Sequence, residues 1–261
     1  LPSVVIDMQR AGPGLGNIWP EQSDYNMVVK GGGHGNYSNL VLAPASAQEM
    51  FDFTRKAFTL ADRYRMTVFI LSDAYIGQMM EPVEISSPVL HGDRKDWAVY
   101  GDAASRSNLI SSIYMNPHLQ RKHNELLQDT YRQLEREQVD YQEILTEDAD
   151  LVFIAYGISA RICLSTVHAL RERGVKVGLM RPKTLFPFPK EPVQALAAQG
   201  KMLAVVELSS GMMADDVELE VRGRTTVLRY LTMGGETPTV NELITKVEHD
   251  LITRSGGGTD V

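Results

Sequence analysis

Short apolar runs alternate with stretches of helical periodicity in the first third of the chain. Runs at 4–8, 40–43 and 68–71 predict strands, and Ser46 and Glu49 have the spacing of a capping box at the start of a helix. The apolar face predicted for that helix consists of Met50, Phe53, Ala57, Leu60, Ala61 and Tyr64. A strand, a helix and a strand in this order predict a parallel sheet with a right-handed crossover.

The same alternation returns in the second half of the chain. Apolar runs at 151–155, 175–180, 202–207 and 226–230 predict four strands. Helices are expected at 159–173, 193–199 and 240–252, with Ser159 capping the first of them and Gly174 ending it. The proline-rich stretch 181–189 predicts a rigid turn, and the whole half predicts an open α/β fold.

Between these blocks the periodicity fades. Residues 81–117 predict an extended connection, and 118–138 predict a polar helix with a narrow apolar stripe at Leu119, Leu126, Leu127 and Leu134. We therefore divide the chain into a first domain (1–85), a linker with a helix (86–147), a second domain (148–254) and a flexible tail (255–261). The chain opens directly on a strand and without methionine, so we expect upstream residues of the first domain to be missing.

Composition narrows the class of protein. The 261 residues are 43% apolar and 23% charged, with a net charge of −7, which argues against nucleic acid or an anionic membrane as a partner. No apolar run approaches the roughly 20 residues of a membrane-spanning helix, and the start of the given sequence predicts no signal peptide. The single cysteine, Cys163, excludes an internal disulfide, predicts a buried thiol and fits a cytoplasmic location.

The strongest candidate for chemistry is Arg10. It stands at the end of the first predicted strand, before a turn that contains Gly12 and Gly14. The carboxyl ends of parallel strands face the ligand crevice, and a guanidinium group can bind a carboxylate through two parallel hydrogen bonds. The alternative is an ordinary surface ion pair.

Two further clusters are less specific. A glycine-rich loop could bring backbone close to a ligand cleft or a subunit interface, or could simply be exposed to solvent. Its residues are Gly31, Gly32, Gly33 and His34. After the first turn, Glu21, Gln22 and Asp24 could orient Arg10, face a neighbouring chain or belong to the surface.

Other motifs are missing. The turn at Gly157 follows a strand but lacks the three glycines of a dinucleotide-binding fingerprint, and no P-loop lysine motif occurs. The sequence offers no catalytic triad, no pair of acid-base carboxylates and no metal-ligand spacing. We therefore assign no catalytic or metal-binding residue, and we expect the site to be shared with other chains or with the upstream part.

Several segments together resemble the alpha-type subunit of 2-oxoacid:ferredoxin oxidoreductases. They are Ile6–Gly16, Gln22–Tyr25, Lys30–Gly35, Leu42–Pro44 and Leu71–Asp73, and a looser likeness continues through 150–235. The Gly-Pro-Gly-Leu-Gly turn and the Gly-Gly-Gly-His-Gly loop look most like the branched-chain (2-oxoisovalerate) type, with the 2-oxoglutarate type close behind.

The resemblance implies a partial pyrimidine-binding-type domain of a thiamine diphosphate enzyme, followed by a transketolase C-terminal-like open α/β domain. It implies oxidative decarboxylation of a 2-oxoacid onto coenzyme A, with electrons passing to ferredoxin, and contact of Arg10 with the substrate carboxylate. It further implies that a beta-type partner subunit holds most of the thiamine diphosphate and its magnesium. Gamma and ferredoxin-like subunits are expected as further partners, with the iron–sulfur clusters on the ferredoxin-like subunits. This chain alone is expected to hold no cofactor and to be inactive.

Two alternative functions are considered beside this interpretation. A non-catalytic assembly subunit would need neither Arg10 nor the glycine turn. A stand-alone α/β nucleotide-binding oxidoreductase would need the glycine fingerprint that the turn at Gly157 lacks.

Overall fold

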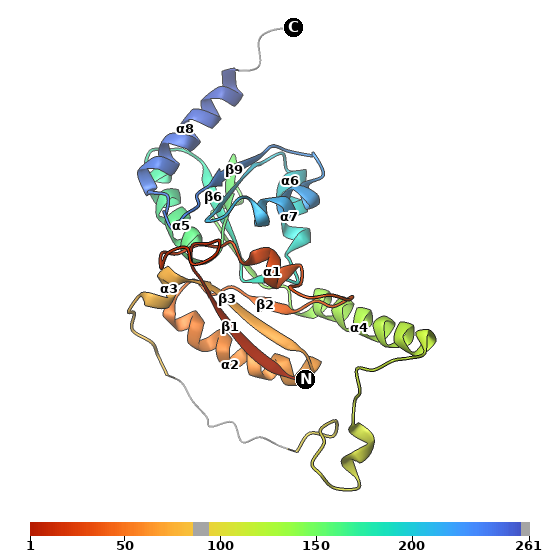
Figure 1. The fold of residues 1–261 in the computed structure, drawn as a ribbon. Coiled ribbons are helices and arrows are strands. Elements are labelled where there is room, and N and C mark those ends of the chain that lie inside the picture. The colour runs from red at the N-terminus through yellow and green to blue at the C-terminus, as the bar shows by residue number, and fades with distance from the viewer. Residues whose placement is uncertain (86–93, 257–261) are drawn as a thin grey trace.

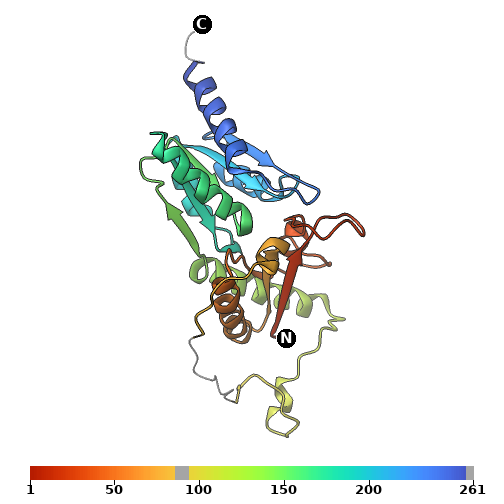
Figure 2. The same ribbon diagram turned by 90° about the vertical axis from the view of Figure 1, so that its left-hand side faces the viewer.

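The computed structural model describes residues 1–85 and 94–256, which form two α/β layers stacked one above the other (Figures 1 and 2). The N-terminal sheet has the strand order β1-β3-β2-β7, and the C-terminal sheet has the order β4-β6-β5-β8-β9. The strands are β1 (Ser3–Gln9), β2 (Leu40–Leu42), β3 (Thr67–Asp73), β4 (Tyr141–Ile144), β5 (Leu151–Ile154), β6 (Val177–Pro182), β7 (Thr184–Phe186), β8 (Met202–Glu207) and β9 (Val227–Leu231). The helices are α1 (Tyr25–Val29), α2 (Ala47–Tyr64), α3 (Ala74–Gln78), α4 (Pro117–Glu137), α5 (Gly157–Glu172), α6 (Lys190–Ala198), α7 (Met212–Val221) and α8 (Val240–Gly256), with a 3-10 turn at Ser105–Asn108.

In the N-terminal sheet, β1 and β2 both pair with β3 in parallel, as the alternation predicts. Helix α2 covers one face with the predicted apolar residues, all of which are buried except Met50, which is half-buried. Its start has the first half of the predicted capping box, since the Ser46 hydroxyl accepts from the Glu49 amide at 3.1 Å. The Glu49 carboxylate accepts from the Ala45 amide, one residue before the N-cap, at 2.9 Å. The sequence therefore predicts this part of the fold correctly.

The C-terminal sheet is covered on both faces. Helices α5 and α8 pack on one side and α6 and α7 on the other. Accordingly every residue of β5, Leu151–Ile154, is fully buried, which explains its uninterrupted apolar sequence. Cys163 on α5 is fully buried as predicted, and burial raises the pKa of its thiol.

One apolar core joins the two sheets. It contains Tyr25 and Val28 of α1 and Leu71 of β3, together with the α6 and α7 side of the C-terminal sheet. Polar side chains join the same two parts of the chain. The Tyr25 hydroxyl donates to Asp216 of α7 at 2.7 Å, and Lys30 forms an ion pair with the same carboxylate. The two sheets are therefore held together by a shared apolar core and by buried polar contacts.

The structure differs from the predictions at several elements. Two short strands were not predicted: β4 lies in the expected linker segment and pairs antiparallel with β6, and β7 leaves the expected second domain to pair antiparallel with β2. Both sit at sheet edges, where neither alternation nor a long apolar run is needed. The stripe of α4 is narrower than predicted, since Leu119 and Leu126 are 56% and 60% exposed, whereas Leu127 and Leu134 pack against the core.

Residues 86–93 of the expected linker and 257–261 of the expected tail lie outside the described residues. Residues 255 and 256, also assigned to the tail, belong to α8. Among the helices that the structure describes, none has the length and apolarity needed to cross a bilayer.

Candidate functional site

A cavity of about 710 Å³ opens where the loops after β1, β8 and β9 meet. Its lining residues are Arg10, Gly12, Pro13, Gly14, Glu21, Ser23, Asp24, Ser209, Ser210, Met212, Met233 and Gly234. Three of the predicted site residues, Arg10, Gly12 and Gly14, thus lie together here. The cavity occupies the carboxyl ends of strands from both sheets, where open α/β sheets bind ligands.

Arg10 uses one of its two terminal nitrogens to hold the glycine turn. Its Nη1 donates to the carbonyl oxygens of Leu15 at 2.5 Å, Asn17 at 3.3 Å and Ala11 at 3.4 Å. Within residues 1–85 and 94–256, Nε and Nη2 have no hydrogen-bond partner and Arg10 forms no ion pair. The surface ion pair considered as an alternative is therefore not what the structure shows, and two donors remain for an anion in the cavity.

The turn itself depends on a glycine that the sequence did not single out. At Gly16, which has φ of +47°, a Cβ atom would lie 1.9 Å from the Ala11 carbonyl oxygen. This close approach is what lets the Leu15 and Asn17 carbonyls converge on the guanidinium group.

Carboxylates surround the single cation of the cavity. Glu21 is 3% exposed and accepts hydrogen bonds from backbone amides on both walls of the cavity. Burial and the nearby Glu21 carboxylate raise the pKa of Asp24, and Arg10 lowers it. Of the charged residues that line the cavity, Arg10 alone attracts an anion, whereas Glu21 and Asp24 repel one.

Asp7, on β1 below the turn, carries a perturbed carboxyl. Burial, together with the charge of Asp24, raises its pKa from 3.8 to about 6. Its Oδ2 atom is buried and has no hydrogen-bond partner among the described residues. The folded chain therefore favours the protonated form of this side chain.

Replacement of Asp7 with Asn is expected to flatten the pH dependence of stability. The folded-state pKa lies above the unfolded value, so this group lowers the free energy of unfolding as the pH rises from about 4 through about 6. D7N removes the proton that the native state binds in excess, so it should gain stability relative to the wild type at pH 8 and not at pH 4. Urea unfolding at both pH values measures this difference, and a constant difference between the two proteins would contradict it.

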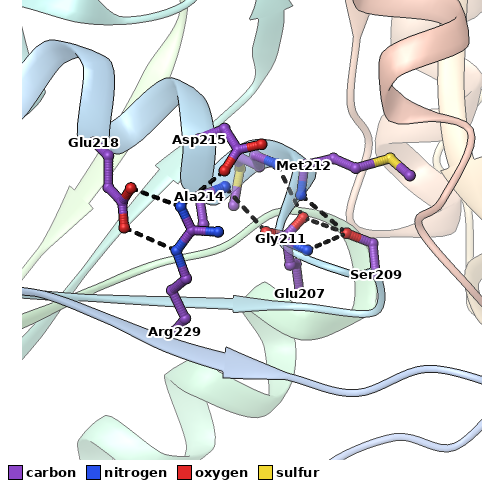
Figure 3. Close-up of polar contacts among 9 residues, drawn as sticks. Glu207, Ser209, Gly211, Met212, Ala214, Asp215, Glu218 and Arg229 are labelled. Atoms are coloured by element: carbon purple, nitrogen blue, oxygen red, sulfur yellow. Dashed lines mark hydrogen bonds and ion pairs between the residues drawn. The ribbon is translucent and has the colours of Figure 1, made fainter.

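The buried carboxylate of Glu207 holds the cavity-lining segment between β8 and α7 in place (Figure 3). Glu207, at the end of β8, accepts from the amides of Met213 and Ala214 at 3.0 Å, and the Ser209 hydroxyl donates to it at 2.8 Å. Burial raises the pKa of Glu207, although these donors oppose the shift. Because Glu207 already satisfies these amides at the start of α7, the residues at 209–212 are held in one conformation.

Outside the cavity, Arg229 of β9 forms ion pairs with Asp215 and Glu218, which both lie on α7 (Figure 3).

The cavity-lining residues Ser209, Ser210 and Met212 were not predicted. They follow directly on a predicted strand, and the rule that strand ends face the ligand could have found them.

Gln22 does not orient Arg10, contrary to one expectation; it joins the two sheets. It is fully buried, donates to the Tyr156 carbonyl at 3.0 Å and accepts from the Leu208 amide at 3.0 Å. Ser159 was predicted to cap its own helix, but that helix begins at Gly157 and the Ser159 hydroxyl donates to Gln22 at 3.1 Å. A long-range partner has thus replaced the local cap.

The start of α5 is occupied by a side chain of the N-terminal sheet. The Asp73 carboxylate accepts from the Ile158 amide at 2.8 Å and from the Ile76 amide at 3.0 Å. A nucleotide phosphate would bind at this helix start in a dinucleotide-binding fold. Asp73 therefore takes the place that a phosphate would occupy at this helix start.

The second glycine cluster does not reach the cavity. The Gly33 amide donates to the Tyr37 hydroxyl at 2.8 Å, Gly31 has φ of +93°, and His34 is exposed. No described residue of this loop lines the cavity, so a role in a ligand cleft is not supported there. Its role at a subunit interface stays a prediction.

Comparison with known proteins identifies the family. Residues 1–143 match the family described as "Pyruvate flavodoxin/ferredoxin oxidoreductase, thiamine diP-bdg", and residues 149–243 match "Pyruvate:ferredoxin oxidoreductase core domain II". The chain is 46% identical over 248 residues to "Ketoisovalerate oxidoreductase subunit VorB" of Methanothermobacter thermautotrophicus, covering 95% of this chain and 70% of that protein. The chain belongs to the 2-oxoacid:ferredoxin oxidoreductases. The resemblance read from the sequence is thereby confirmed.

Other members of the 2-oxoacid:ferredoxin oxidoreductases are more distant. "2-oxoglutarate synthase subunit KorA" of Methanothermobacter marburgensis is 31% identical over 274 residues, covering 94% of this chain and 73% of that protein. The solved 2-oxoglutarate:ferredoxin oxidoreductase of Magnetococcus marinus superposes with a TM-score of 0.76 at 21% identity, over 96% of this chain and 49% of that chain. This match confirms the predicted fold class; the chain spans about half the length of that solved chain.

The residues of this chain do not by themselves fit the diphosphate end of thiamine diphosphate. In residues 1–85 and 94–256 no group of three His, Cys, Asp or Glu side chains is placed to hold a metal ion. Arg10 is the single basic residue lining the cavity, and it is accompanied by Glu21 and Asp24. A magnesium-bound diphosphate would therefore need ligands from elsewhere.

Proposed function

We propose that this chain is the alpha-type subunit of a thiamine diphosphate-dependent 2-oxoacid:ferredoxin oxidoreductase and supplies the wall that binds the substrate carboxylate. The observation that carries this proposal is the position of Arg10 in the cavity, with Nε and Nη2 available at the carboxyl end of β1. A 2-oxoacid presents a carboxylate next to its reacting carbonyl carbon. A guanidinium fork would fix that carbon relative to the cofactor.

The lining favours a 2-oxoacid with an apolar side chain. Met212 and Met233 supply apolar surface, and Met side chains adapt to branched aliphatic groups. The second carboxylate of 2-oxoglutarate would meet Glu21 and Asp24 without a second cation from the lining of this chain. Together with the 46% identity to a ketoisovalerate oxidoreductase subunit, this supports a branched-chain 2-oxoacid as the substrate.

The remaining parts of the reaction belong to other subunits in this proposal. A beta-type partner holds most of the thiamine diphosphate and its magnesium, a gamma subunit is a further partner, and ferredoxin-like subunits carry the iron–sulfur clusters. Decarboxylation is the chemistry that thiamine diphosphate supplies when bound. The acyl group is transferred to coenzyme A and the electrons pass to ferredoxin, in the cytoplasm. This chain alone is proposed to be inactive.

The test uses the complex that contains this chain and its partner subunits. With coenzyme A and a viologen dye, thiamine-dependent dye reduction is compared for 2-oxoisovalerate, 2-oxoglutarate and pyruvate. We expect reduction with all components present, and the highest kcat/KM with 2-oxoisovalerate. No reduction with any of the three, in a complex shown to contain cofactor and clusters, would favour a non-catalytic assembly subunit.

The alternative of a nucleotide-binding oxidoreductase is tested separately. Because Asp73 occupies the start of α5, we expect no NAD(P) binding to the chain by calorimetry. Micromolar binding would overturn this expectation.

A further inference from the structure

The two walls of the cavity come from different sheets, and Glu21 is bonded to both. Its Oε2 atom accepts from the Gly12 amide of the Arg10 turn at 2.9 Å and from the Ser23 hydroxyl at 3.0 Å. Its Oε1 atom accepts from the Gly234 amide, in the loop after β9, at 2.7 Å. The buried Glu21 carboxylate therefore links the two walls of the cavity, with one oxygen bonded to the Arg10 turn and the other to the loop after β9.

A neighbouring set of contacts brings the same two segments together. The Asn17 side-chain amide donates to the Gly234 carbonyl at 3.0 Å. Gly235 approaches so closely that a Cβ atom there would lie 2.5 Å from the Cβ of Trp19. The loop at 233–235 is thus seated on residues 17–19, and Met233 at its start lines the cavity opposite the Arg10 turn.

We propose that Glu21 is a positioning residue that sets the separation between the Arg10 turn and the loop at 233–235. This inference rests on the proposed function in one respect, that the cavity binds the 2-oxoacid. Glu21 lines the cavity, but both of its oxygens accept from backbone amides, so the side chain is held in place by the two segments that it joins. Glu21 would influence substrate binding by fixing the positions of Gly12 and Gly234.

The chemistry of the contacts makes a sharp test available. All three partners of Glu21 donate, and a backbone N–H cannot accept. In Glu21→Gln, one carboxylate oxygen becomes an NH₂ group, which would face an amide N–H or the Ser23 hydroxyl. The variant retains the size of the side chain and can satisfy the backbone amide of one wall only.

The matched control is Glu81→Gln. Glu81 also joins the two halves of the chain, because it accepts from the Ala47 amide at 3.0 Å and pairs with Arg161 of α5 at 2.8 Å. It does not line the cavity. Each variant therefore loses one carboxylate oxygen as an acceptor, in E21Q at the cavity and in E81Q away from it.

The kinetic readout is steady-state turnover of the complete complex with the 2-oxoacid that it uses best. E21Q should raise the KM for the 2-oxoacid about tenfold, with kcat and the KM for coenzyme A changed by less than about twofold. E81Q should leave the KM for the 2-oxoacid within about twofold of the wild type. Equal KM values for E21Q and the wild type would overturn the positioning role.

A second readout does not depend on activity. Amide hydrogen exchange in the complex should show faster exchange at Gly12 or at Gly234 in E21Q and unchanged exchange at both in E81Q. Unchanged exchange at both glycines in E21Q would overturn the positioning role of Glu21, even if the wild-type complex fails to turn over any 2-oxoacid and the proposed function is wrong.

Discussion

Gly157→Ala is expected to lower the free energy of unfolding by about 3–5 kcal/mol, one of the two largest effects predicted for this chain. Gly157 has φ of +56°, and an added Cβ would lie 2.3 Å from Asp73 Oδ2 and 2.9 Å from Gln22 Nε2. Neither neighbour can retreat without breaking buried hydrogen bonds. The variant must therefore move the start of α5 away from the N-terminal sheet, or lose the hydrogen bonds that Asp73 and Gln22 make there.

The bonds at risk can be named. Asp73 accepts from Ile158 at the start of α5 and from Ile76 at the start of α3, and burial raises the pKa of its carboxyl. Gln22 is bonded to Leu208 at the end of β8 as well as to the α5 segment. A buried polar group left without its partner costs about 1–3 kcal/mol. The clash and one lost bond together account for the expected magnitude.

Gly174→Ala separates backbone strain from packing. Gly174 has φ of +80°, after the end of the same helix, but nothing lies within 4 Å of a Cβ built there. Urea unfolding should show a loss of about 1–2 kcal/mol for G174A, from the left-handed backbone alone. Equal losses in G174A and G157A would mean that the contact of Gly157 with Asp73 and Gln22 adds nothing.

These residues show why the fold was more predictable than the junction. Strands such as β5 and the face of α2 follow from apolar runs and periodicity, which are local properties of the sequence. The role of Gly157 depends on Asp73, far away in the chain, so local pattern could only note a glycine after a strand. The predicted cap at Ser159 failed for the same reason, since Gln22 competes for its hydroxyl.

The candidate site was predicted on one wall only. Arg10 was found because an arginine at a strand end before a glycine turn has a clear chemical use. The opposite wall, with Met212 and Met233, has no distinctive motif and is brought to Arg10 by the stacking of the two sheets. Glu21 was named, but its bond to Gly234 could not be read from a sequence in which the two residues are so far apart.

Arg10→Ala is expected to raise the KM of the complete complex for its 2-oxoacid by at least about 100-fold, with a smaller effect on kcat. Two hydrogen bonds from Nε and Nη2 to the substrate carboxylate would be lost, and each bond to a charged group contributes about 1.5–3 kcal/mol. Steady-state viologen reduction measures the change, with the KM for coenzyme A as the internal control. Arg121→Ala, on the exposed face of α4, should match the wild type. An unchanged KM in R10A would reject the role of Arg10.

Arg10→Lys and added guanidinium separate substrate binding from support of the turn. Lysine keeps the positive charge but lacks the planar fork, so it cannot hold the Leu15 and Asn17 carbonyls and also form two parallel bonds to a carboxylate. We therefore expect R10K to keep a KM at least tenfold above the wild type. Guanidinium ion should lower the KM of R10A and leave that of R10K unchanged, since only the alanine variant leaves space for the ion. Full activity of R10K would show that Arg10 contributes charge alone, and that the orientation of the carboxylate by its fork plays no part.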